Sequence, residues 1–114
     1  MKYNIYVFLD QRGKPYYVGK TNNFKRRRRE HLEAIRTMNP LPKYRKARWL
    51  LKNGYKFRMR TVAKALIEKD AYEIETFYIK KYLKAGHRLT NLTHNGQDKK
   101  LTKKKVTRYK RRKK

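Results

Sequence analysis

The stretch Asn4–Leu9 constrains the fold more than any other part of the chain. Its residues are Asn-Ile-Tyr-Val-Phe-Leu, so apolar side chains occupy both faces of an extended segment. This pattern predicts a strand in the centre of a β-sheet. The turn-forming segment Asp10–Pro15 follows, and Tyr16–Lys20 then has the composition of a second strand. The sequence therefore predicts a β-hairpin at the start of the domain.

The next part of the chain predicts three helices and a third strand. Thr21–Asn23 offers a helix N-cap, Pro40 and Pro42 interrupt the helical pattern, and Gly86 ends it. The predicted helices are Phe24–Arg36, Lys43–Lys52 and Lys69–Leu83, and the predicted third strand is Lys56–Val62. The resulting order, β-β-α-α-β-α, indicates a small α/β domain with helices packed on a three-stranded sheet.

Positive charge dominates the composition. The 114 residues include 35 Lys or Arg and 8 Asp or Glu, which gives a net charge of +27. Such an excess indicates a polyanionic partner. Residues 99–114 hold 11 of the cations and no acid, with too few apolar side chains to build a core. We therefore expect a domain at residues 1–96 and a basic tail at 97–114 that is disordered, or helical on DNA binding.

The composition also excludes several classes of protein. The chain has no Cys, which excludes disulfides, Cys-ligated zinc, iron–sulfur clusters and thiol catalysis. No apolar run is long enough to cross a membrane, and the N-terminal residues lack the pattern of a signal peptide. We expect a protein of a reducing, intracellular setting.

Two tyrosines of the predicted hairpin share one face of the sheet. If the turn holds an even number of residues, Tyr6 and Tyr17 point to the same side, beside Gly19. The missing side chain of Gly19 leaves open space next to Tyr17. Cross-strand aromatic packing is one explanation of the pair, and a catalytic role is the other.

The first predicted helix begins with the basic run Lys25–Arg29. Arg27 and His31, four residues apart, lie at the edge of its buried stripe, whereas Arg26 and Arg29 face away. A solvated basic helix that contacts phosphate groups without any chemistry would have the same pattern. Both interpretations stay open at this point.

The third predicted helix places Glu75 in the middle of an apolar stripe, while Glu73 faces water. A carboxylate on a core face is costly unless it is paired or binds a cation. A salt bridge to an arginine and a site for a hard divalent cation are both consistent with this position. In the polar segment after the helix, Asn91 either belongs to a turn, orients other groups or contacts phosphate.

Six short motifs follow one another in a fixed order. They are Asn4–Tyr6, Tyr17–Gly19, Lys20–Asn22 leading to Arg27 and His31, Trp49, Glu75 with Ile79, and Leu89–Thr93. This arrangement resembles the GIY-YIG nuclease family over residues 4–96, and in particular its small phage and homing-type members. Asn4 stands where the first motif has Gly, and His94–Gly96 stands where a Gly-Gly pair is usual. Neither position carries a reacting group in the family.

The resemblance implies a small three-stranded antiparallel sheet flanked by helices. It also implies a DNA endonuclease that hydrolyses phosphodiester bonds with one divalent metal ion, Mg²⁺ or Mn²⁺, bound by Glu75. The catalytic residues that it implies are Tyr6, Tyr17, Arg27, His31, Glu75 and Asn91. A tyrosine, with Tyr6 favoured over Tyr17, would accept a proton from water and relay it to His31. Arg27 would stabilise the charge that develops on the phosphate.

The expected partner is DNA, with no membrane and no organic cofactor. The candidate DNA-binding residues are Lys20, Lys25, Arg26, Arg28, Lys103, Lys104, Arg108, Arg111 and Arg112. We expect low sequence specificity, because few residues follow the nuclease region, and a cytoplasmic location in a bacterial or phage-infected host. The alternative is a non-catalytic basic nucleic-acid-binding protein. Glu75 separates the two, because a simple binder has no use for a carboxylate on its core stripe.

Overall fold

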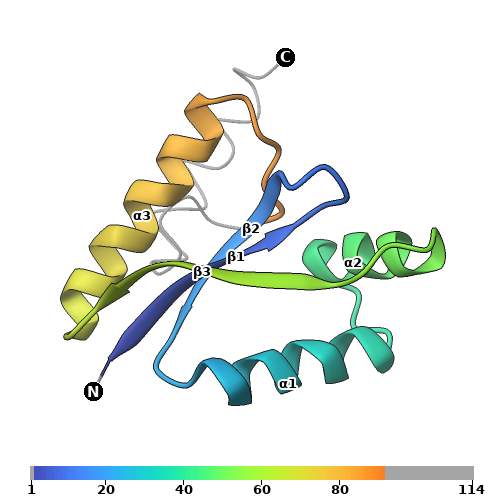
Figure 1. Ribbon diagram of the computed structural model, residues 1–114, viewed down its shortest axis with the longest axis horizontal. Coiled ribbons are helices and arrows are strands. Elements are labelled where there is room, and N and C mark those ends of the chain that lie inside the picture. The colour runs from blue at the N-terminus through green and yellow to red at the C-terminus, as the bar shows by residue number, and fades with distance from the viewer. Residues whose placement is uncertain (1, 92–114) are drawn as a thin grey trace.

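The structure is a computed structural model that describes residues 2–91. Its strands are β1 (Tyr3–Leu9), β2 (Pro15–Thr21) and β3 (Arg58–Ala65), and its helices are α1 (Phe24–Arg36), α2 (Pro42–Lys52) and α3 (Glu68–Lys84). The strands form one antiparallel sheet in the order β2-β1-β3 (Figure 1). The predicted α/β fold and the predicted order of elements are confirmed. Predictions about residues 92–114, which include the basic tail, lie outside the described residues.

Strand β1 is the central strand, and its two faces pack against different helices. Tyr6 and Phe8 lie in a core cluster with side chains of α1 and α2, whereas Ile5, Val7 and Leu9 lie in a second cluster with side chains of α3. Figure 1 shows the same division, with α3 on one side of the sheet and α1 and α2 on the other. Burial on both faces explains why apolar residues occupy both parities of this strand. Among the described residues, no helix is long and apolar enough to cross a membrane.

Asp10 closes the turn between β1 and β2. Its carboxylate accepts hydrogen bonds from the backbone N–H groups of Arg12 and Lys14, both at 2.9 Å. The turn leads to a register in which Tyr6 lies opposite Gly19 and Phe8 lies opposite Tyr17. Residues directly opposite each other point to the same face. Tyr6 and Tyr17 therefore share one face of the sheet, as the sequence predicts.

Strand β3 extends further than predicted. It begins at Arg58 and continues past the predicted end at Val62 to Ala65. The extension follows from β1, whose first residues also need hydrogen-bonding partners. A register shift in the β1–β3 ladder allows Ala65 to pair with Tyr3. The alternating pattern of the sequence does not reveal such a shift.

Helix α2 begins at Pro42, which the sequence pattern marks as a helix breaker. Proline suits the first helical position, because the N–H group that it lacks would have no partner within the helix. The guanidinium group of Arg48 then joins α2 to the end of α1. It donates hydrogen bonds to the backbone oxygens of Ile35 at 3.3 Å and Asn39 at 2.8 Å. This cation is therefore engaged in holding the two helices together.

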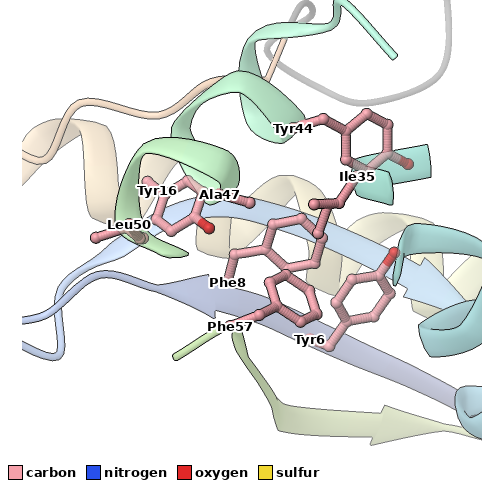
Figure 2. Packing of buried hydrophobic residues seen from close by; sticks show 8 residues of the cluster. All are labelled: Tyr6, Phe8, Tyr16, Ile35, Tyr44, Ala47, Leu50 and Phe57. Atoms are coloured by element: carbon pink, nitrogen blue, oxygen red, sulfur yellow. The ribbon is translucent and has the colours of Figure 1, made fainter. Parts of the chain in front are cut away.

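Gly19 permits a close approach by the ring of Tyr6. A β-carbon built on Gly19 would lie 2.5 Å from the Tyr6 hydroxyl oxygen and 2.6 Å from the ring carbon that bears it. These distances are well inside van der Waals contact. Tyr6 is only 1% exposed and is surrounded by side chains such as Phe8, Ile35 and Phe57 (Figure 2). The ring therefore has no free space into which it could move.

We expect Gly19→Ala to destabilise the fold by about 1–3 kcal/mol, which is typical of overpacking a filled core. At an uncrowded strand position the same change would stabilise the fold by about 0.5–1 kcal/mol, because it restricts the unfolded chain. The sign of the change in unfolding free energy, measured by urea denaturation, is therefore diagnostic. An alanine variant as stable as the parent protein would contradict the contact.

Candidate active site

Three buried side chains form a hydrogen-bonded line between the sheet and the helices. The hydroxyl oxygen of Tyr6, on β1, lies 2.7 Å from Nε2 of His31, on α1. Nδ1 of His31 lies 2.7 Å from the hydroxyl oxygen of Tyr44, on α2. His31 is completely buried, on the side of α1 where the helical pattern predicts it. The imidazole thus connects three elements of the fold.

Burial sets the protonation states along this line. It raises the pKa of Tyr6 to about 12, although the Arg27 guanidinium opposes the rise, and it also raises the pKa of Tyr44. The pKa of His31 falls to about 3, mainly because of burial and in part because of the positive charges of Arg27 and Lys43. At neutral pH His31 is therefore a neutral imidazole. One of its ring nitrogens donates a hydrogen bond and the other accepts one.

Arg27 places a cation beside the buried line. Its guanidinium is half-buried, whereas Arg26 and Arg29 on the same helix are exposed. Nη1 of Arg27 donates a hydrogen bond to Oε1 of Glu30 at 2.9 Å. Exposed ion pairs of this kind are worth only about 0–1 kcal/mol. The guanidinium can therefore exchange Glu30 for another anion at little cost, while its charge already acts on Tyr6.

Glu75 is a buried carboxylate, and one of its oxygens has no partner among the residues that the structure describes. It lies on α3 and is 5% exposed, and its Oε1 atom makes no hydrogen bond within the described part of the chain. The ion pairs found in residues 2–91 do not include it, so the salt bridge considered from the sequence does not form there. Burial raises the pKa of Glu75 to about 7, and Lys20 opposes the rise. Glu73 is exposed, as predicted.

The charge of Glu75 reaches tyrosines on the opposite face of the sheet. Burial is the main reason why the pKa of Tyr17 lies well above its ordinary value, and the charges of Tyr6 and then Glu75 contribute to the rise. Glu75 also contributes to the raised pKa of Tyr6, after the larger effect of burial. Helix α3 packs on the face of the sheet opposite α1 and α2, and it contacts all three strands. The carboxylate therefore acts on these tyrosines from the other side of the sheet.

Asn91 occupies the outer edge of β2. Its side-chain oxygen accepts a hydrogen bond from the backbone N–H of Val18 at 3.0 Å, and its side-chain nitrogen donates one to the Val18 carbonyl at 2.8 Å. Next to it, the backbone N–H and the hydroxyl group of Thr90 both donate to the carbonyl of Tyr16. The amide thus replaces a neighbouring strand. Both polar atoms of the Asn91 side chain are thus bonded to the backbone of Val18, and its predicted role in the site stays a prediction.

The candidate DNA-binding residues differ in their surroundings. Lys25, Arg26 and Arg28 are exposed on α1. Lys20 is half-buried near the end of β2, where its charge acts on Glu75. Lys103, Lys104, Arg108, Arg111 and Arg112 lie outside the described residues. The described candidates thus comprise an exposed group on α1 and one cation close to the buried carboxylate.

A comparison with known protein families agrees with this geometry. The family model of the GIY-YIG catalytic domain matches residues 2–91, which is most of the chain. The chain belongs to the GIY-YIG nuclease family. Membership indicates a nuclease, and it implies DNA as the substrate class. No curated protein and no solved structure matches the chain.

The two motifs that give the GIY-YIG family its name meet in space here. Asn4–Tyr6 lies on β1 and Tyr17–Gly19 lies on β2, and the two strands are paired. The tyrosine that ends the first motif lies against the glycine that ends the second. The pairing of the motifs thus has a steric reason, since any larger residue at position 19 would displace the Tyr6 ring.

Sequence reasoning missed two residues of this site, Lys43 and Tyr44, both on α2. A signal for Tyr44 does exist. Tyr44, Ala47 and Leu50 recur at helical spacing and are all buried, and a buried tyrosine hydroxyl usually has a hydrogen-bond partner. Lys43 has no such signal, because it is one of 35 cationic residues in the chain.

The depressed pKa of His31 predicts a specific pH dependence of stability. The unfolded chain binds a proton at this histidine below about pH 6.5, whereas the folded protein does so only near pH 3. The contribution of His31 to stability is therefore complete above pH 6.5 and declines as the pH falls. We expect the stability advantage of the parent protein over His31→Gln to shrink by up to about 1.4 kcal/mol per pH unit between pH 6 and pH 4. Urea denaturation of both proteins measures it, and an advantage that is constant with pH would contradict a neutral buried imidazole.

Proposed function

We propose that this protein is a metal-dependent endonuclease that hydrolyses phosphodiester bonds in DNA. The observation that supports the proposal most is the buried carboxylate of Glu75. Within residues 2–91 one of its oxygens has no hydrogen-bond partner, and its charge acts on Tyr6 and Tyr17. A fold that only bound nucleic acid would gain nothing from this arrangement, because an unpaired buried charge is costly and repels phosphate.

A divalent cation bound by Glu75 is part of the proposal. The unpartnered oxygen of Glu75 suits a hard cation, and Mg²⁺ commonly binds to one or two carboxylates together with water and substrate phosphates. Within residues 2–91, no group of three His, Cys, Asp or Glu side chains could hold a metal ion. Glu75 would therefore be the protein ligand, with water and DNA oxygens as the others. When bound, the cation would polarise a phosphate oxygen and stabilise the leaving 3′ oxygen.

The hydrogen bonds of Tyr6, His31 and Tyr44 support a route for the proton in the proposed reaction. If Nδ1–H of His31 donates to Tyr44, Nε2 is free to accept a proton from Tyr6. A water molecule can then give its proton to the Tyr6 oxygen while the phenol proton moves to Nε2. Because the pKa of Tyr6 is about 12 and that of His31 is about 3, the two transfers have to occur together. Arg27 stabilises the negative charge that develops on the phosphate in the transition state.

The exposed cations of α1 fit a role in DNA binding. Lys25, Arg26 and Arg28 have no burial that would commit them to the core. Lysine and arginine contacts to the DNA backbone give affinity without base selectivity. We therefore also propose that the enzyme cleaves DNA with low sequence specificity. The proposal places the enzyme inside the cell, where its DNA substrate is.

Glu75→Gln tests the proposal. The amide keeps the size of the side chain but lacks the charge that binds a divalent cation. We expect cleavage of supercoiled plasmid DNA in Mg²⁺ to fall by roughly 10³-fold or more, and EDTA to abolish cleavage by the parent protein. DNA binding should be retained, because removal of an anion does not weaken attraction to phosphate.

Glu73→Gln is the matched control, because Glu73 lies on the same helix but is exposed, and it should cleave normally. Without metal at pH 8, Glu75→Gln should be more stable than the parent protein by about 1–3 kcal/mol. The reason is that the pKa of Glu75 rises from 4.5 to about 7 on folding. At pH 8 the side chain is ionised in both states, and the buried charge in the folded protein lowers its stability. A well-folded Glu75→Gln protein that still cleaves DNA in Mg²⁺ would contradict the metal assignment.

Arg27→Ala should reduce the cleavage rate by about 10²–10³-fold, as expected when a group that stabilises transition-state charge is lost. Arg26→Ala is the control, since Arg26 also faces Glu30, at 3.7 Å, but is exposed. Both changes remove one charge, so DNA affinity should fall by similar amounts. Single-turnover rates at saturating DNA separate the two effects. Equal, modest losses in both variants would mean that α1 is only a phosphate-binding surface.

A further inference from the structure

Lys43 brings a second cation, besides Arg27, to the tyrosines, and it is not among the residues of the family motifs. It lies in the first turn of α2 and is half-buried. Its Nζ atom donates a hydrogen bond to the Tyr17 hydroxyl oxygen at 3.2 Å. The same nitrogen lies 4.2 Å from the centre of the Tyr17 ring and 5.1 Å from the centre of the Tyr44 ring. The ammonium group is therefore held by aromatic side chains.

No carboxylate stabilises this ammonium group within residues 2–91, since the ion pairs there involve Arg26, Arg27 and Arg36. The pKa of Lys43 falls to about 8, mainly because of burial and in part because of the charge of Arg27. Long lysine side chains usually keep the ammonium group in water. Here the group faces a tyrosine hydroxyl beside another cation, which is unfavourable for stability. Strongly perturbed titratable groups of this kind cluster at functional sites.

The chemistry of the ammonium group determines how Tyr17 can be used. An ammonium group has three hydrogen-bond donors and no acceptor. In the contact with Lys43, the Tyr17 oxygen must therefore be the acceptor. The phenol proton of Tyr17 stays available for donation to another group. Tyr6 differs, because its partner His31 has a ring nitrogen that can accept a proton.

We propose that Lys43 is a positioning residue that holds Tyr17 as a hydrogen-bond donor to an oxygen of the scissile phosphate. This inference rests on the proposed nuclease function. It divides the work between the two tyrosines: Tyr6 exchanges a proton with His31, while Tyr17 keeps its proton and binds the phosphate. The cations Lys43 and Arg27 make the region attractive to an anion, which is the chemistry that this role requires.

A double-mutant cycle tests the coupling between the two residues. Lys43→Met removes the charge but keeps an unbranched side chain, and Tyr17→Phe removes the hydroxyl group. We expect each change to reduce kcat for plasmid cleavage in Mg²⁺ by about 10- to 100-fold with little change in KM, as for the loss of one preorganised donor. The double variant should be no slower than Tyr17→Phe. Lys43→Arg, which is also a cation without an acceptor, should retain most of the activity.

Lys46→Met is the matched control. Lys46 lies one turn further along α2, where its ammonium group lies 5.0 Å from the centre of the Tyr16 ring. The change removes the same charge and a similar aromatic contact without touching Tyr17, so kcat should be unchanged. Thermal denaturation of every variant shows whether it is folded. If Lys43→Met does not fold, Lys43→Gln takes its place in the cycle.

Three results would overturn the inference. Losses that multiply in the double variant would mean that Lys43 acts independently of Tyr17. A change in KM alone, equal to that of Lys46→Met, would make Lys43 an ordinary phosphate-binding residue. Failure of Lys43→Arg to restore activity to a folded protein would exclude a role as a simple cationic donor. Absence of Mg²⁺-dependent cleavage by the parent protein is a different result, which would overturn the proposed function itself.

Discussion

The contact between Tyr6 and Gly19 is the constraint on which the rest of the site depends. Since Gly19 has no side chain, the Tyr6 ring can lie across β2 and bring its hydroxyl group to His31 at 2.7 Å. His31 is held in turn by Tyr44, so one buried polar line connects β1, α1 and α2. A buried polar network whose members are all satisfied favours a single arrangement of the core. The same line positions the tyrosine that the proposed reaction needs.

The electrostatics of the site are unbalanced in a way that suits a phosphate substrate. Lys20 from β2, Arg27 from α1 and Lys43 from α2 supply positive charge, whereas Glu75 from α3 supplies a single buried negative charge. Stability alone would favour neither the unpaired carboxylate nor the half-buried lysine. Both become useful when a phosphate group and a divalent cation enter together. In the proposed function, the protein thus accepts a cost in folding free energy for a site that its substrate completes.

The sequence predicts the fold and part of the site, because these depend on local periodicity. Apolar residues on both faces of β1 indicate a central strand, and the helical pattern of α3 places Glu75 on the buried side. Other contacts join residues that are distant along the chain. The Lys43–Tyr17 hydrogen bond spans 26 residues, and the bond between Asn91 and Val18 spans 73. Periodicity carries no information about such pairs, so only the three-dimensional structure reveals them.

The most direct test of the central claim is a crystal structure of the protein bound to DNA in the presence of Ca²⁺, used to hold the substrate uncleaved. The account predicts a cation on the Glu75 carboxylate. It also predicts one backbone phosphate in contact with Arg27 and with the hydroxyl group of Tyr17. A complex in which the DNA lies only along the exposed cations of α1, with Glu75 still buried and without a cation, would contradict the account.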